Sequence, residues 1–270
     1  MSAWLIALFA WLGAIVVFSL FWVVQKRTGD AGIVDVVWGS SVGILAVVFC
    51  FSVSGNVPRR WIIATLAVCW SARLSWYVLQ RVLKMPEDGR YVELKEAWGD
   101  QVDYKMFRFY QLQAFASVLF ALPMLIAAWN ATPLGWLDFV GIAVWVFAIG
   151  GEAIADSQLH RFRLDPDNKG KVCRDGMWYY SRHPNYFFEW LHWWSYVLLA
   201  ITGQFGWLAI FAPLTMLFFI LKITGIPPTE KQAIKSRGDA YRRYQETTSA
   251  FFPWFPKPNP TNDSNTVSTS

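Results

Sequence analysis

A chain of 270 residues could form one or two soluble domains, but 55% of its residues are hydrophobic, 18% are aromatic and only 16% are charged. This composition excludes an ordinary soluble protein, because a soluble core cannot bury so much apolar surface. The net charge of +5 indicates membrane topology and binding of anionic ligands rather than a nucleic-acid surface.

Apolar runs recur along the chain at about the length of 20 residues that crosses the hydrocarbon of a bilayer. They predict an all-α fold, a polytopic bundle of seven transmembrane helices at 3–24, 33–53, 61–80, 109–129, 134–154, 185–203 and 205–223. We expect one membrane domain over 1–256 and a disordered polar tail over 257–270. No basic segment precedes the first run, which is therefore expected to be a span and not a cleaved signal.

The links between these runs differ strongly in basic residues. The links at 25–32, 81–108 and 155–184 carry 2, 6 and 6 Lys and Arg residues and the segment after 221 carries 7, whereas the opposite side carries only Arg59 and Arg60. By the positive-inside rule, the N-terminus is predicted outside and the C-terminus in the cytosol. The three cysteines form no C-x-x-C pair, so neither a disulfide nor a metal site is predicted.

The first polar residues of interest lie around the second span. Asp35 stands early in that span among small residues that would let a ligand approach. It could polarise a substrate or simply cap the helix, and both interpretations stay open. In the next cytosolic link, Arg90 and Tyr91 follow a turn at 86–89 and are either ordinary loop residues or contacts for a phosphate and a hydroxyl.

The fifth span leaves the membrane with a polar stripe. Its members follow one another at spacings of four, four and three residues, which places them on one helical face: Glu152, Asp156, His160 and Arg163. Ion pairs on a solvated helix end would give the same pattern. Because Glu152 still lies within the apolar run, a site is favoured.

The loop at 164–184 is rich in charge and turns. Its polar side chains include Asp165, Asp167, Asn168, Lys169, Lys171, Arg174 and Arg182. Basic residues bind phosphate oxygens, while carboxylates and an amide accept or share hydrogen bonds with ribose hydroxyls, so this loop could hold an anionic cofactor. The alternative is a positive-inside loop with nothing bound.

The sixth span gives the strongest local signal. His183, Pro184 and Asn185 lead directly into it, and Glu189 follows Asn185 by one turn on the same face. An ionisable residue at that depth usually lines a cavity or pairs with a partner. The sequence therefore predicts a site here, with a structural pairing of Glu189 to Arg73 or Arg182 as the alternative.

Together these segments resemble the steroid 5α-reductase family, in particular its bacterial branch of seven-span proteins. The resemblance covers most of the chain and is carried by GIVDVVWG at 32–39, DGRY at 88–91, Ala155-Asp156 with Arg163, GMWYYSRHPNYFFE at 176–189 and YRRYQETTSAFFP at 241–253. It implies reduction, with NADPH, of the double bond of a 3-oxo-Δ4 steroid or another apolar enone. It also implies a bacterial inner-membrane enzyme with a cytosol-facing site and a substrate that enters from the lipid.

The resemblance implies roles for individual residues. Asp156, Arg163, Asn185 and Glu189 would hold NADPH, together with Lys171, Tyr180 and Glu230. The predicted cofactor set further includes Arg90, Glu152, His160, Asn168, Arg182 and His183. Asp35 matches the region of the acid that binds the enone carbonyl; Trp70 stands where a partner tyrosine is sought, and Tyr91 is a substitute for it. Apart from membrane lipid, no nucleic acid or obligate protein partner is expected.

Two other classes of function remain open. RHPNY at a helix start, followed by a C-terminal Glu and Tyr-x-x-Tyr, also resembles the isoprenylcysteine carboxyl methyltransferases, which use S-adenosylmethionine. The basic loop suits a pyrophosphate and a 2′-phosphate and so favours the reductase. A transporter or passive scaffold is the third hypothesis, for which several spans and one buried Glu would suffice.

Overall fold

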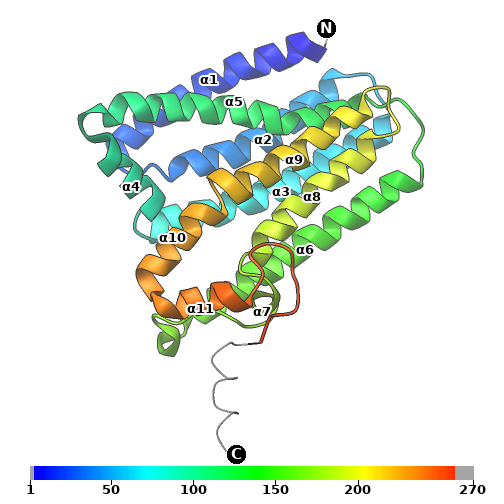
Figure 1. Ribbon diagram of the computed structural model, residues 1–270. Coiled ribbons are helices and arrows are strands. Elements are labelled where there is room, and N and C mark those ends of the chain that lie inside the picture. Colours follow the sequence, from blue (N-terminus) through cyan, green and yellow to red (C-terminus); the bar gives the residue numbers. More distant parts are fainter. Residues whose placement is uncertain (1–2, 259–270) are drawn as a thin grey trace, which may run out of the picture. The chain divides into compact units, whose positions relative to one another are not determined.

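The computed structural model describes residues 3–258, over which the chain forms helices joined by turns, with no strand (Figure 1). The helices are α1 (Ala3–Thr28), α2 (Ile33–Ser52), α3 (Val57–Lys84), α4 (Gly89–Trp98), α5 (Val102–Trp129), α6 (Trp136–Leu164), α7 (Met177–Tyr180), α8 (Pro184–Ala200), α9 (Phe211–Phe218), α10 (Ile226–Arg237) and α11 (Asp239–Thr247). Short 3₁₀ turns lie at Gly99–Gln101, Pro166–Asn168 and Gly206–Ile210, and a π turn lies at Phe219–Ile223. The predicted all-α fold is confirmed for this part of the chain. Of the predicted tail at 257–270, residues 259–270 lie outside the described range.

Six helical segments in the described range are long and apolar enough to cross a membrane. They are Leu5–Thr28, Ile33–Ser52, Val57–Lys84, Gly89–Trp129, Trp136–Leu164 and Gly206–Arg237. The predicted span without a counterpart among these segments is the sixth, at 185–203; it corresponds to α8, which has 17 residues and falls short of the usual length of about 20. The chain is therefore a polytopic membrane protein, while the seventh crossing and the orientation stay predictions.

The described chain divides into two compact units. The first unit runs to Trp145 and includes Trp193–Ala212, and the second comprises Val146–His192 and the described residues from Pro213 on. In the first unit, α2 packs against α3 and α5, and α1 packs against α5 and α2 (Figure 1). The close approach of α2 to α3 requires Gly43, because a Cβ there would lie 2.3 Å from Ser71 Oγ.

Aromatic rings fill the interior of the first unit. Trp38 meets Trp70 and Phe120 edge to face, with ring centroids 6.2 and 5.6 Å apart, and Trp193 lies 5.4 Å from Trp70. Such ring pairs stabilise the core beyond what the burial of their apolar surface contributes. At one end of the unit, Arg59 is fully buried and pairs with Asp138 at 2.6 Å, which fixes the link between α5 and α6 to the start of α3. Arg59 is thus a structural residue.

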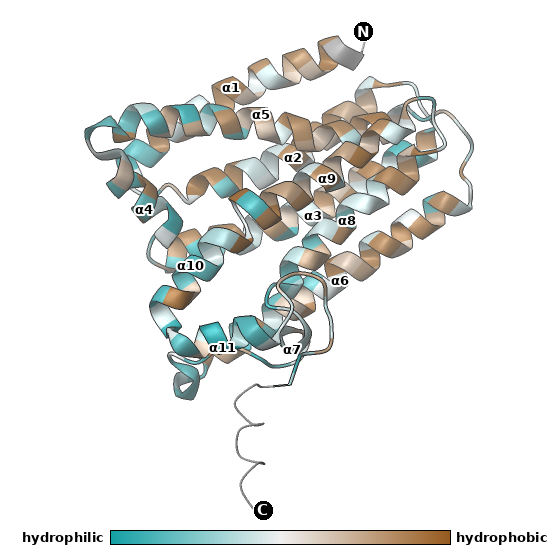
Figure 2. Cartoon of the chain, viewed as in Figure 1, coloured by the Kyte–Doolittle hydropathy of each residue, from teal (hydrophilic) through white to brown (hydrophobic). Residues whose placement is uncertain are grey.

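The second unit contains polar helices, and Figure 2 shows α11 and much of α10 as hydrophilic. Ala233, Tyr241 and Tyr244 form a small core there. The hydroxyl of Tyr244 donates to the backbone carbonyl of Trp178, whose own indole N–H donates to Ala155 O on α6 at 2.9 Å. These bonds fasten α11 and the segment around α7 to α6, and so position the loop that precedes α8.

Candidate functional site

The first group of candidate residues lies around the start of α2, in the first unit. The Tyr91 hydroxyl donates to Asp35 Oδ1 at 2.7 Å. The other carboxylate oxygen lies 3.4 Å from Arg90 Nη2 and 3.7 Å from Arg81 Nη2. The structure therefore brings together Asp35, Arg90 and Tyr91, as expected of a common site, and adds Arg81.

Asp88 completes this group, which we call the Asp35 cluster (Asp35, Arg81, Asp88, Arg90 and Tyr91). Its side chain accepts from the Arg90 backbone N–H as the N-cap of α4 and pairs with the guanidinium groups of Arg90 and Arg81 at 3.1 and 3.3 Å. Burial alone would raise the pKa of Asp88, but the hydrogen bond and charge of Arg90, helped by Arg81, outweigh it and lower the pKa. Two carboxylates thus share two guanidinium groups, and the buried Tyr91 hydroxyl is the neutral donor among them.

A neighbouring ion pair holds α4 against the start of α2. Glu87 accepts from the Ala31 backbone N–H at 2.6 Å and pairs with Lys95 at 2.7 Å. This pair fixes the segment before α4, and with it Asp88 and Arg90, beside Asp35. The sequence analysis missed Arg81 and Asp88. The signals for them were a basic residue in the last turn of α3 and an N-cap Asp directly before Gly89.

The second group lies in the second unit, where α6 faces the start of α8. The amide of Asn185 donates to Asp156 Oδ1 at 3.2 Å, across 29 residues of sequence. The amide oxygen of Asn185 is buried and accepts no hydrogen bond from any described residue. Glu152 is buried one turn before Asp156, and Glu189 lies one turn after Asn185 with His192 Nδ1 3.6 Å from its carboxylate. The structure thus brings Asp156 and Asn185 of the predicted cofactor set into contact, with Glu152 and Glu189 one helical turn away on their own helices.

Three other predicted cofactor residues are engaged with one another. Glu230 accepts from Arg182 Nε at 2.7 Å, lies 3.2 Å from His183 Nε2, and accepts from Gln245 Nε2 at 2.6 Å. Arg182 also donates to the backbone carbonyls of Gln245 and Thr248. These residues tie α10 and α11 to the start of α8 and so brace the Asn185 group. Arg182, one alternative partner for Glu189, is paired with Glu230 instead.

His183 is held neutral in this brace. Burial lowers its pKa below the ordinary value of 6.5, although the hydrogen bond and charge of Glu230 act in the opposite direction. Its ring stacks on Tyr186 with centroids 5.3 Å apart. A neutral, stacked imidazole in contact with a carboxylate fixes the chain direction into α8.

The remaining predicted residues lie at the exposed edge of the second unit. His160, Arg163, Lys171 and Tyr180 are exposed. Asn168 donates to Phe162 O at 3.2 Å and shapes its own loop. The end of α10 reaches this loop, since Arg237 Nε donates to Lys171 O at 2.9 Å, and both Arg163 and Arg237 lie within electrostatic range of Cys173. The loop therefore presents cations from two elements.

Comparison with known proteins finds a distant relative and a family profile that match this chain. An uncharacterised protein of Schizosaccharomyces pombe, C594.04c, is 27% identical over 266 residues, which cover 87% of this chain and 76% of that protein. No solved structure matches the chain. A family profile described as "Protein of unknown function (DUF1295)" matches residues 21–248. Since the match spans both candidate groups, the chain belongs to the DUF1295 family, which is related to the steroid 5α-reductase-like membrane proteins.

Proposed function

We propose that this protein is a membrane reductase that uses NADPH to reduce the C=C bond of an apolar enone, such as a 3-oxo-Δ4 steroid. The observation that carries the proposal is the Tyr91–Asp35 hydrogen bond, in which a buried hydroxyl is held at a carboxylate flanked by two guanidinium groups. The kinship of the family with steroid 5α-reductase-like proteins supports it.

The chemistry requires a hydrogen-bond donor at the carbonyl. When hydride adds to the β-carbon of an enone, negative charge develops on the carbonyl oxygen, and a proton must later reach the α-carbon. Asp35 accepts a hydrogen bond from the Tyr91 hydroxyl, and its other carboxylate oxygen faces the guanidinium groups of Arg81 and Arg90, so in this arrangement it is a hydrogen-bond acceptor. We therefore assign the donor role to Tyr91: when substrate binds, its single O–H would turn from Asp35 Oδ1 to the carbonyl oxygen, while Asp35 keeps its contacts with Arg81 and Arg90.

The second unit has the donors and acceptors that a dinucleotide needs. NADPH supplies the hydride when bound, and the protein has to hold and orient it. The amide oxygen of Asn185 would accept a hydrogen bond from a carboxamide or hydroxyl, Asp156 and Glu189 would accept from ribose hydroxyls, and Arg163 with Lys171 would attract phosphate. Buried polar atoms are normally satisfied, so the Asn185 oxygen is a specific reason to place a ligand here.

The orientation is part of the proposal. By the positive-inside rule, the basic links support a seven-span protein with the Asp35 cluster and the Asn185 group at cytosolic helix ends, and the family resemblance suggests a bacterial inner membrane. NADPH would then bind from the cytosol, while the apolar substrate would enter from the lipid.

The test uses the full-length protein in nanodiscs with NADPH and a panel of enones, following nicotinamide absorbance and product mass. Tyr91→Phe is expected to lower kcat by about 10²–10³, as for the loss of an oxyanion donor, and to leave NADPH affinity unchanged. Asn185→Ala is expected to weaken NADPH binding by about tenfold or more. Tyr104→Phe, an exposed tyrosine on α5, is the matched control and should behave as wild type.

Two outcomes would contradict the proposal. One is full activity in Tyr91→Phe, which would remove the Asp35 cluster from the reaction. The other is thermal stabilisation by S-adenosylmethionine without any response to NADPH, which would favour the methyltransferase interpretation.

A further inference from the structure

An exposed aromatic surface lies on the second unit, outside the candidate spans. We call it the aromatic patch, and its members are Tyr179, Tyr180, Phe252, Trp254 and Phe255. Trp254 and Phe255 are 71% and 75% exposed, although they lie in a segment that follows the last helix. Large aromatic side chains grouped on a surface usually mark a contact with another molecule or with a membrane.

The patch is held in a defined position. The backbone N–H of Trp254 donates to Tyr180 O at 2.9 Å, and the Lys257 N–H donates to Thr247 O at 2.8 Å. Ser181 Oγ donates to Phe251 O at 2.9 Å, and Phe251 itself is buried. The segment is therefore fastened to α7 and α11 on both sides of the exposed rings. These bonds hold the rings in their exposed positions.

A run of ring contacts connects the patch to a candidate membrane span. Phe252 packs on Phe187 and Trp190 of α8 with ring centroids 5.9 and 5.8 Å apart. Phe187 contacts Phe188, and Phe188 lies 5.7 Å from Phe147. Phe147 is 64% exposed on α6, which is long and apolar enough to span the membrane. An unbroken run of rings thus leads from a candidate span to the patch.

The depth and charge of this region suit a bilayer interface. Asp156, which pairs with Asn185 at the start of α8, lies 20 residues after the first residue of α6, or about 30 Å along a helix, which is the thickness of the hydrocarbon. Trp and Tyr prefer the headgroup level just beyond it. Lys257 and Arg174 are exposed in the same part of the unit, and anionic headgroups attract such cations.

We propose that the aromatic patch is embedded in the lipid headgroup layer and acts as an interfacial anchor for the C-terminal part of the protein. The anchor holds α7 and α11 at the bilayer surface, and therefore also the basic loop between α6 and α7. The lipid anchor is independent of the proposed reaction, because it requires only the position of the patch and no reduction of enones.

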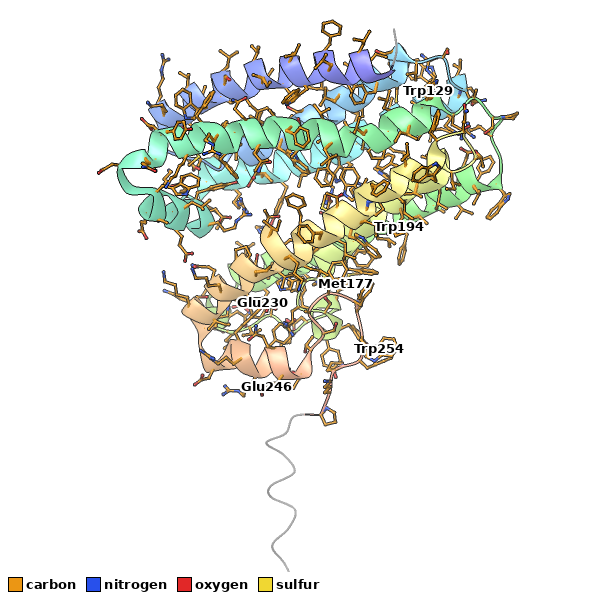
Figure 3. The ribbon with its side chains drawn as sticks, turned by 45° about the horizontal axis from the view of Figure 1, so that its top comes forward. Trp129, Met177, Trp194, Glu230, Glu246 and Trp254 are labelled. Carbon is orange, nitrogen blue, oxygen red and sulfur yellow. The ribbon has the colours of Figure 1, made fainter. Side chains whose placement is uncertain are left out.

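The first test measures depth at single sites. Nitroxide labels are placed at Trp254→Cys and Phe255→Cys in full-length protein without its three native cysteines, in vesicles that contain anionic lipid. Both labels should be more accessible to oxygen than to a water-soluble nickel chelate. The matched control is Glu246→Cys, an exposed position on α11 (Figure 3), which should show the reverse. Water-like accessibility at 254 and 255 would overturn the proposal.

A second test uses the unsubstituted protein, so that misfolding of a variant cannot decide the result. A lipid-soluble aryl diazirine is photolysed in the same vesicles, and the adducts are located by mass spectrometry. Labelling of 251–257 should exceed that of α11 at least fivefold and approach that of the exposed face of α6.

The spin labels of the first test also detect a second copy of the chain. Strong spin–spin broadening of the Trp254→Cys label that disappears on dilution with unlabelled protein would assign the patch to a contact between two copies and contradict the lipid anchor.

Discussion

His183 makes the stability of the second unit depend on pH. Burial lowers the pKa of its imidazole in the folded protein, so the unfolded chain binds more protons below the ordinary value of 6.5. The contribution is complete above pH 6.5 and is lost as pH falls toward the lower, folded pKa. We expect the Tm in detergent to fall between pH 7.5 and 5, and to fall less in His183→Gln. An identical slope in the two proteins would assign the pH dependence to other groups.

Gly43 tests the packing of α2 on α3. A Cβ at this position would lie 2.3 Å from Ser71 Oγ and 2.4 Å from Ser71 Cβ, so Gly43→Ala forces the two helices apart. Overpacking of this kind costs about 1–3 kcal/mol. The control is Gly150→Ala on α6, where a Cβ meets nothing within 4 Å and the better helix former should be neutral or slightly stabilising. Thermal unfolding of both variants is compared, and equal stabilities would refute the close approach.

At the scale of single residues, helical spacing predicted which side chains share a face of one helix. Asp156 and Asn185, which stand on different helices, were assigned to one cofactor set by the family resemblance, and the structure brings them into contact. Arg81 was not foreseen, because its role depends on the turn that brings Asp88 back to α3. The engagement of Arg182 with the carbonyls of Gln245 and Thr248 was also beyond sequence reasoning, since backbone acceptors carry no residue signature.

At the scale of elements, the Arg182–Glu230 ion pair fastens α10 and α11 to the start of α8. Its side chains are only 10% and 14% exposed, so removing one partner leaves a largely buried charge. We expect Glu230→Gln and Arg182→Gln each to cost about 2–4 kcal/mol of stability and to speed amide hydrogen exchange in α11. The matched control is Arg242→Gln, which removes the exposed Asp239–Arg242 pair and should change little.

The combined variant separates this ion pair from its surroundings. If Arg182 and Glu230 act on each other, the double substitution should cost clearly less than the sum of the single ones. Additive losses would mean that each residue stabilises the fold through its other partners, Gln245 and the backbone carbonyls.

Elements with a strong apolar period were the most predictable part of the fold, and their boundaries were the least. The spans predicted at 33–53 and 61–80 match α2 and α3, because charges and turn residues bound the runs. The span predicted at 205–223 is instead built from a 3₁₀ turn, α9 and a π turn. Hydropathy reports only that a segment is apolar and does not distinguish an α-helix from a 3₁₀ or π turn.

At the scale of the whole molecule, the number of crossings depends on α8. Its 17 residues rise about 25 Å, somewhat less than the hydrocarbon thickness. Within the first unit, however, Thr202 beyond the end of α8 accepts from Asn130 Nδ2 at 2.7 Å, and Asn130 O accepts from the Asn56 backbone N–H at 3.0 Å. The links after α2, α5 and α8 therefore lie at one end of that unit, as a seventh crossing by α8 would require.

Cysteine accessibility decides between seven crossings and six. Exposed positions Ser54 and Thr202 are replaced by Cys, with Arg174→Cys as the control on the basic side and Cys69→Ser as the background. In intact cells, a membrane-impermeant maleimide should label Ser54→Cys and Thr202→Cys, whereas Arg174→Cys should react only after the membrane is opened. The expectation follows from the contacts of Thr202 with the uncharged links and from the concentration of Lys and Arg on the opposite side. Protection of Thr202→Cys together with Arg174→Cys would show that α8 does not cross, and would place both chain ends on the same side of the bilayer.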